Sequence, residues 1–200
     1  PGRVDHRDTF LDTDRQERDR GITIFSKQAR FSWKNMEVTL LDTPGHVDFS
    51  AEMERTLQVL DCAVLIVSGA DGVQSHTLTL WRLLKRYQVP VFIFFNKMDQ
   101  PETDGEKLLA GVQKELDGRC VCFSQNRKEK TFFEDVALCD ETLLDKYVKW
   151  EETGASEGAD AIEGADAIEG AGAPFSPEEI ADLVQRRSLF PCFFGSALKG

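Results

Sequence analysis

The sequence lacks the features that mark several common classes of protein. No stretch approaches about 18 consecutive apolar residues, so no membrane-spanning segment is predicted. The 24 basic residues are outnumbered by 35 acidic ones, which argues against a basic domain that wraps nucleic acid. The five cysteines show no Cys-x-x-Cys spacing and there are three histidines, so neither a zinc site nor a disulfide framework is expected. Free thiols in a core indicate a reducing compartment, and we predict a cytoplasmic protein.

The acidic residues are unevenly spread. Seven of the 35 lie in Glu151–Gly172, which holds no base and repeats Glu-Gly-Ala-Asp-Ala-Ile at 157–162 and 163–168. Such a tract cannot bury a core, so residues 151–173 are predicted to be a disordered insert. The rest of the chain has 28 acidic and 24 basic residues, a net charge of only −4. With 200 residues, 41% of them hydrophobic, the chain is long enough for one domain with a sizeable core.

Strand-like and helix-like segments alternate along the chain. Residues 1–20 are charged and without apolar periodicity, which indicates a loop. We expect strands at 22–33, 37–42, 62–68, 91–95 and 189–194, and helices at 50–60, 75–88, 103–116, 141–150 and 176–187. Residues 119–140 follow no clear pattern. The apolar run at 62–68 is typical of a strand buried on both faces, and Thr103 is a candidate helix cap. This alternation predicts an α/β fold with a mainly parallel sheet flanked by helices.

Polar segments follow three of these strands. They are Asp42-Thr43-Pro44-Gly45-His46, Asn96-Lys97-Met98-Asp99 and Gly195-Ser196-Ala197-Leu198-Lys199. Ligands of such sheets bind outside the carboxyl ends of the strands, so we expect the three segments to share one site.

The chemistry of these segments suits a nucleotide. Asp42 at a strand end can hold Mg²⁺, and Gly45 lets a backbone N–H approach a terminal phosphate, although the same residues could form only a strand-ending turn. The Asp99 carboxylate can accept hydrogen bonds from N1–H and the exocyclic amine of guanine, a donor pair that adenine lacks. Asn96 can bond the base and brace the loop, and the Lys97 stem can cover the ring. The alternative for this segment is a charged turn.

A hydroxyl lies on the charged loop near the start of the chain. Thr23, in Arg20-Gly21-Ile22-Thr23-Ile24, can ligate Mg²⁺ and reach a phosphate, as in loops that become ordered around a triphosphate. Taken alone, this segment is a turn that leads into a strand.

Together, these segments resemble the translational GTPase family, whose order they follow. Residues 42–61 and Asp71-Gly72-Val73-Gln74 are similar to the elongation factor G branch. Phe31-Ser32-Trp33, residues 94–100 and residues 188–197 are most similar to the tetracycline-resistance ribosomal protection proteins. The resemblance covers the chain outside the acidic insert.

The resemblance implies a role for each residue of the site. Thr23 and Asp42 would contact Mg²⁺, and Gly45 would sense the γ-phosphate together with Thr23. His46 would orient the attacking water once large-subunit RNA of the ribosome draws it inward. The guanine base would be read by Asn96, Lys97 and Asp99 and supported at its carbonyl by the backbone of Ser196, Ala197 and Leu198.

The implied protein is a ribosome-dependent GTPase. Residues 1–200 would be part of its GTP-binding (G) domain, with residues 1–20 in the switch I loop region. It would bind GTP or GDP with Mg²⁺, hydrolyse GTP to GDP and phosphate on the ribosome, and act as a monomer away from membranes. Its work would be tetracycline displacement, or translocation or a related remodelling step.

One element of the family is absent from this sequence. No Gly-x-x-x-x-Gly-Lys-[Ser/Thr] loop occurs, and in the family this P-loop precedes the segment that here begins at Arg20. We therefore expect a P-loop GTPase-type G domain without its first strand and P-loop. The isolated chain should bind GTP poorly, fold marginally and associate. The alternative is a non-catalytic, G-domain-like ribosome-binding module, if the P-loop is truly absent from the protein.

Overall fold

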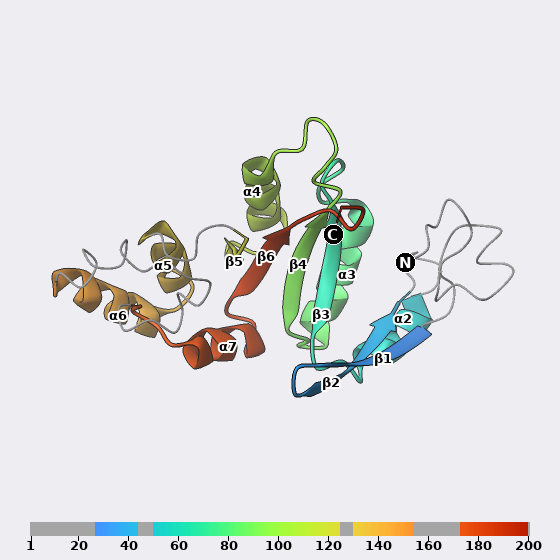
Figure 1. Ribbon diagram of the computed structural model, residues 1–200, viewed down its shortest axis with the longest axis horizontal. Coiled ribbons are helices and arrows are strands. Elements are labelled where there is room, and N and C mark those ends of the chain that lie inside the picture. Colours follow the sequence, from blue (N-terminus) through green and yellow to red (C-terminus); the bar gives the residue numbers. More distant parts are fainter. Residues whose placement is uncertain (1–26, 44–49, 125–129, 154–172, 200) are drawn as a thin grey trace, which may run out of the picture. The chain divides into compact units, whose positions relative to one another are not determined.

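The computed structural model describes residues 27–43, 50–124, 130–153 and 173–199 (Figure 1). The chain divides into two compact units, Pro1–Leu60 and Asp61–Gly200. None of the helices in the described ranges combines the length and apolar character needed to cross a membrane.

The first unit contains a β-hairpin and a helix. Strands β1 (Lys27–Trp33) and β2 (Met36–Asp42) pair antiparallel, with Trp33 opposite Met36 at the turn. Helix α2 (Ser50–Leu57) follows. The predicted strands and helix of this region are therefore present, although β1 begins at Lys27 within the described residues. One face of the hairpin carries large apolar side chains that are about half exposed, namely Phe31, Trp33, Met36 and Leu40.

The second unit is built on a four-stranded parallel sheet, in the order β3-β4-β6-β5 (Figure 1). Its strands are β3 (Ala63–Ser68), β4 (Val91–Asn96), β5 (Cys120–Cys122) and β6 (Phe190–Phe194). Helix α3 (Ser75–Arg86) connects β3 to β4, and α4 (Gly105–Glu115) connects β4 to β5. The predicted α/β fold with a mainly parallel sheet is confirmed.

The two faces of β3 differ in burial. Leu65 and Val67 are buried, whereas Val64 and Ile66 are 58% and 56% exposed. The prediction of a strand buried on both faces is therefore wrong. The apolar run is therefore covered on one face only, and β3 is also the edge strand of the described sheet.

The start of α4 corrects the predicted cap. The helix begins at Gly105, and its N-cap is Asp104, whose carboxylate accepts the backbone N–H of Glu106 at 3.1 Å and of Lys107 at 3.2 Å. The prediction that Thr103 caps this helix is wrong because the neighbouring carboxylate satisfies the free N–H groups of the first turn.

Three further helices lie between β5 and β6 in chain order. We call α5 (Lys130–Ala137), α6 (Glu141–Glu152) and α7 (Pro177–Gln185) the helical lobe. Residues 119–140, which showed no clear pattern, thus hold β5 and α5. The predicted start of α7 is confirmed, with Ser176 as the cap in a reciprocal capping box. α6 continues to Glu152, so the first two residues of the predicted insert are helical, and residues 154–172 lie outside the described residues.

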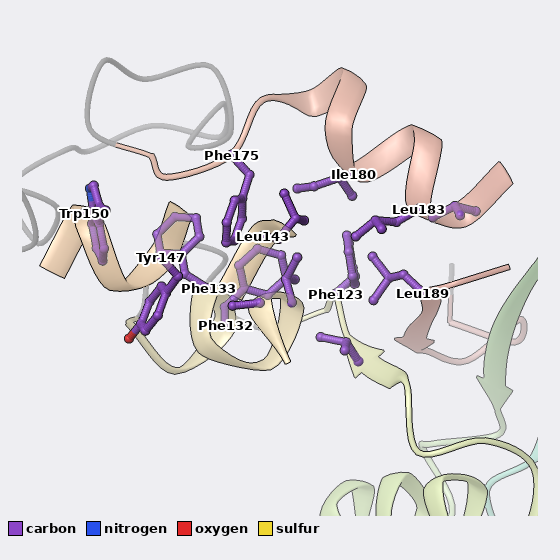
Figure 2. Close-up of a cluster of buried hydrophobic side chains, with 14 residues drawn as sticks. Phe123, Phe132, Phe133, Leu143, Tyr147, Trp150, Phe175, Ile180, Leu183 and Leu189 are labelled. Atoms are coloured by element: carbon purple, nitrogen blue, oxygen red, sulfur yellow. The ribbon is translucent and has the colours of Figure 1, made fainter. Parts of the chain in front are cut away.

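The helical lobe packs around a hydrophobic cluster that extends to Val121 of β5 and to Phe123 and Leu189 beside the sheet (Figure 2). Aromatic rings from α5 and α6 meet edge to face, with the Phe133 and Trp150 centroids 5.7 Å apart. Phe175, just before α7, approaches the same Phe133 ring at 6.2 Å. Ile180 and Leu183 of α7 complete this core, so the three helices are held together by side chains far apart in the sequence.

Candidate functional site

The carboxyl ends of β4 and β6 bring two polar loops together. We call Asn96–Asp99 the β4 loop and Gly195–Lys199 the β6 loop. The strands are neighbours in register, with Phe95 opposite Phe194, so the loops leave the same edge of the sheet (Figure 1). The Gly195 N–H donates to the Phe95 carbonyl at 3.0 Å, and the Met98 N–H donates to the Gly195 carbonyl at 3.1 Å. Two of the three predicted polar segments therefore meet.

Asn96 braces both loops with one oxygen. Its Oδ1 accepts the backbone N–H of Lys97 at 2.8 Å and that of Ala197 at 2.9 Å. Lys97 has a φ of 65°, so the chain turns sharply directly after β4. Within the described part of the chain, the amide nitrogen of Asn96 has no protein partner, which leaves a donor for a ligand.

Asp99 is held as a carboxylate. The pKa of Asp99 is lowered, chiefly by hydrogen bonding toward the Ser196 side chain, then by the backbone N–H of Asp99 and less by the positive charge of Lys199. The side chain remains partly exposed. A partly exposed, ionised carboxylate can accept a pair of N–H groups from a ligand.

The β6 loop is folded tightly on itself. Ser196 Oγ accepts the Leu198 N–H at 3.3 Å, and the Ser196 carbonyl accepts the Lys199 N–H at 3.1 Å. The N–H groups of Ala197 and Leu198, predicted to support a guanine carbonyl, both donate to side-chain oxygens here. A ligand carbonyl would accept the same two N–H groups, either together with these side-chain oxygens or in their place.

Sequence reasoning missed the structural role of Gly195 and the side-chain role of Ser196. A Cβ on Gly195 would lie 2.9 Å from the Phe94 ring, so the close approach of the loop to β4 requires glycine. The hydroxyl of Ser196, rather than its backbone alone, serves the site through Asp99. Only the polar segment after the last strand pointed to this region, and no sequence pattern pairs Ser196 with Asp99.

The remaining predicted residues belong to the first unit. Asp42 is the last residue of β2 and is partly buried. Thr23, Gly45 and His46 lie outside the described residues. The position of these residues relative to the β4 and β6 loops therefore stays a prediction.

The comparison with known families agrees with this arrangement of strands and loops. A family model described as "Elongation factor Tu GTP binding domain" matches residues 2–200. This chain belongs to that family. The predicted membership in the translational GTPases is thereby confirmed, and the domain it represents is one that binds guanine nucleotide.

Relatives within this GTP-binding family include the expected tetracycline resistance proteins and also ribosome-releasing factors. Tetracycline resistance protein TetW from Butyrivibrio fibrisolvens is 36% identical over 208 aligned positions, which cover 100% of this chain and 30% of TetW. The mitochondrial Ribosome-releasing factor 2 of Drosophila ananassae is 35% identical over 151 positions, covering 76% of this chain and 20% of that protein. The chain therefore spans less than a third of the length of these relatives.

A solved structure supports the fold. The crystal structure of a protein from Thermus thermophilus matches 98% of this chain and 33% of that chain, with a TM-score of 0.74 and 22% sequence identity. At this identity the likeness concerns the fold, which is that of the GTP-binding domain.

Proposed function

We propose that this chain is the guanine-nucleotide-binding part of a ribosome-dependent GTPase. The observation that carries the proposal is that Asn96 Oδ1 joins the β4 loop, which holds Asp99, to the β6 loop through the N–H groups of Lys97 and Ala197. Family membership and the names of the relatives, which are ribosome-releasing factors and tetracycline resistance proteins, support the same function.

Guanine selectivity follows from the donors and acceptors of the two loops. The Asp99 carboxylate accepts N1–H and the exocyclic amine of guanine, and the Asn96 amide donates to the base. Adenine offers no N1–H, so its binding would deprive the carboxylate of this donor pair and be weaker than that of guanine. The exposed Lys97 stem covers one face of the ring.

Phosphate chemistry is assigned to the first unit. Asp42 offers a carboxylate at a strand end, the ligand type that Mg²⁺ takes alongside nucleotide oxygens. Thr23 would complete the shell and contact the γ-phosphate, Gly45 would meet the γ-phosphate, and His46 would place the attacking water. The bound Mg²⁺ would neutralise phosphate charge during transfer.

The proposed protein works as a monomer in the cytoplasm with the ribosome as its partner. Large-subunit RNA would bring His46 into position, and hydrolysis to GDP and phosphate would release the loops around the γ-phosphate. Displacement of tetracycline is one proposed outcome of this cycle, and translocation or a related remodelling step is the other.

Exchanging the carboxylate for an amide tests the guanine reader. In the full-length protein, Asp99→Asn should lower GDP affinity and raise the affinity for xanthosine diphosphate, because the amide donates where the carboxylate accepts. Calorimetric titration with both nucleotides measures the change. Asp117→Asn, at an aspartate that pairs with Arg119 at 2.8 Å, is the matched control and should keep the preference for GDP. Retention of that preference in Asp99→Asn would overturn the assignment.

A further inference from the structure

Thr103 lies outside every motif named above, yet its hydroxyl reaches the β4 loop. Its Oγ1 is 3.1 Å from the carbonyl oxygen of Met98 and 3.0 Å from that of Gln100. These two residues flank Asp99 in the sequence. One side chain therefore holds the backbone on both sides of the carboxylate that would read guanine.

The hydroxyl projects from a well-anchored position. Thr103 directly precedes Asp104, the N-cap of α4, whose carboxylate accepts the Glu106 N–H at 3.1 Å. On its other side, the Thr103 methyl carbon lies 3.4 Å from the place that a Cβ would take on Gly69. Gly69 in turn donates its N–H to the Asn96 carbonyl at 2.7 Å. Thr103 is thus held between the start of α4 and the end of β3.

The same end of α4 also contacts the strand that leads into the β6 loop. A Cβ on Gly105 would lie 3.5 Å from the Phe194 ring. Phe194 stacks on Phe95, with centroids 4.6 Å apart and 9° between the planes. Phe95 directly precedes Asn96, and Phe194 directly precedes Gly195. The start of α4 is therefore a common support for both loops.

We infer that Thr103 is a positioning residue for guanine recognition: its hydroxyl fixes the backbone around Asp99 so that both carboxylate oxygens meet the base. The inference rests on the proposed function. Without the hydroxyl, the backbone at Met98 and Gln100 loses its shared donor and Asp99 can shift. A shifted carboxylate weakens two hydrogen bonds to guanine but only one to hypoxanthine, which lacks the exocyclic amine. The signature is therefore a change in the ratio of affinities, rather than a uniform loss.

The test compares GDP with IDP in the full-length protein. Thr103→Val keeps the shape of the side chain and removes the hydroxyl. We expect the preference for GDP over IDP to fall about fivefold, the scale of one hydrogen bond. Thr103→Ala should lower the ratio in the same way and serves if the valine variant is poorly folded. Isothermal titration calorimetry measures both affinities.

Two further variants separate positioning from general destabilisation. Thr103→Ser restores the hydroxyl and should return the ratio to within about twofold of wild type. Thr153→Val removes a comparable bond, from Thr153 Oγ1 to the Trp150 carbonyl at 2.9 Å at the end of α6, and should leave the ratio unchanged.

The outcomes distinguish the inference from the function on which it rests. If wild type prefers GDP over IDP and the valine and alanine variants keep the same ratio, the role of Thr103 is overturned while the guanine reader stands. A serine variant as impaired as the valine variant also overturns it, because the hydroxyl would then not matter. A wild-type protein with no preference for GDP overturns the proposed guanine reader and this inference together.

Discussion

At the scale of single residues, the charge of Asp99 depends on its neighbours in the β6 loop. Hydrogen bonding from Ser196 is the main cause of the lowered pKa, and the charge of Lys199 contributes less. Asp99 therefore stays ionised at a pH at which an ordinary aspartate begins to take up a proton, and any interaction that needs its charge is lost only when the pH falls through the lowered value.

Removal of the hydroxyl should raise this pKa. We expect Ser196→Ala to shift the pKa of Asp99 upward toward its ordinary value, and Lys199→Ala to shift it in the same direction by less. Carbon-13 NMR of aspartate-labelled protein follows the titration. The pKa of Asp104, lowered mainly by the backbone and side chain of Lys107, is an internal control that should not move. An unchanged Asp99 titration in Ser196→Ala would show that the hydroxyl does not bond the carboxylate.

His46 is the residue that we predict to affect hydrolysis without affecting nucleotide binding. Phosphoryl transfer depends on positioning more than on strong bases, so a histidine that places the water should affect rate and not affinity. In the full-length protein, His46→Ala should lower ribosome-stimulated GTP hydrolysis by about two orders of magnitude or more, with GDP affinity kept. Phosphate release with and without ribosomes measures this. His76→Ala, at an exposed position of α3, should change neither quantity, and an unchanged rate in His46→Ala would remove His46 from the mechanism.

At the scale of elements, truncation of a core side chain of the helical lobe should lower the free energy of unfolding. Phe133 is buried among rings of α5, α6 and the approach to α7, so Phe133→Ala should cost about 3–5 kcal/mol of stability. Urea unfolding followed by far-ultraviolet circular dichroism measures the loss. Leu144→Ala, at an exposed position of α6, should cost less than about 1 kcal/mol. Equal losses in the two variants would show that the rings do not form the core of the lobe.

The sequence predicts elements well where periodicity or capping is strong. Ser176, Pro177 and Glu179 give α7 a cap, a first-turn proline and an acidic third position, and the helix begins there. β5 has only three residues, too few for a periodic pattern, so the region around it was not predicted. Adjacent residues Thr103 and Asp104 can both cap a helix, and the choice between them depends on the tertiary contacts of Thr103 with the β4 loop.

Sequence patterns also did not predict that a charged residue would be buried. Arg187 is only 7% exposed and has a φ of 58°, one residue beyond the C-cap of α7. Its guanidinium donates to the Val89 carbonyl and lies 5.2 Å from the Trp81 ring and 5.1 Å from the Phe190 ring. These partners come from distant parts of the chain, and their meeting is a property of the folded sheet.

At the scale of the whole molecule, the candidate site could be predicted in part. The rule that ligands bind at the carboxyl ends of parallel strands brings the loops of β4 and β6 together from sequence alone. The rule gives no order of the strands, so the pairing of Ser196 with Asp99 and the support from α4 follow only once β4 and β6 are neighbours. For the same reason, the sequence could not show that β3 would end the described sheet.

That edge has a consequence for the isolated 200-residue chain. Parallel sheets are ordinarily covered on both faces, whereas Val64 and Ile66 are more than half exposed on β3, which is an edge strand among the residues that the structure describes. We expect the isolated chain to self-associate at micromolar concentration, as sedimentation velocity would show by a rise in sedimentation coefficient with concentration. The double substitution Val64→Lys with Ile66→Lys should shift the population toward monomer, because charges on an edge strand oppose strand addition. The double substitution Leu144→Lys with Val148→Lys, which places the same two charges on exposed apolar positions of the helical lobe, should leave association unchanged. Equal relief by both changes would assign the effect to net charge, and a wild-type chain that stays monomeric would show that the exposed face of β3 does not drive association.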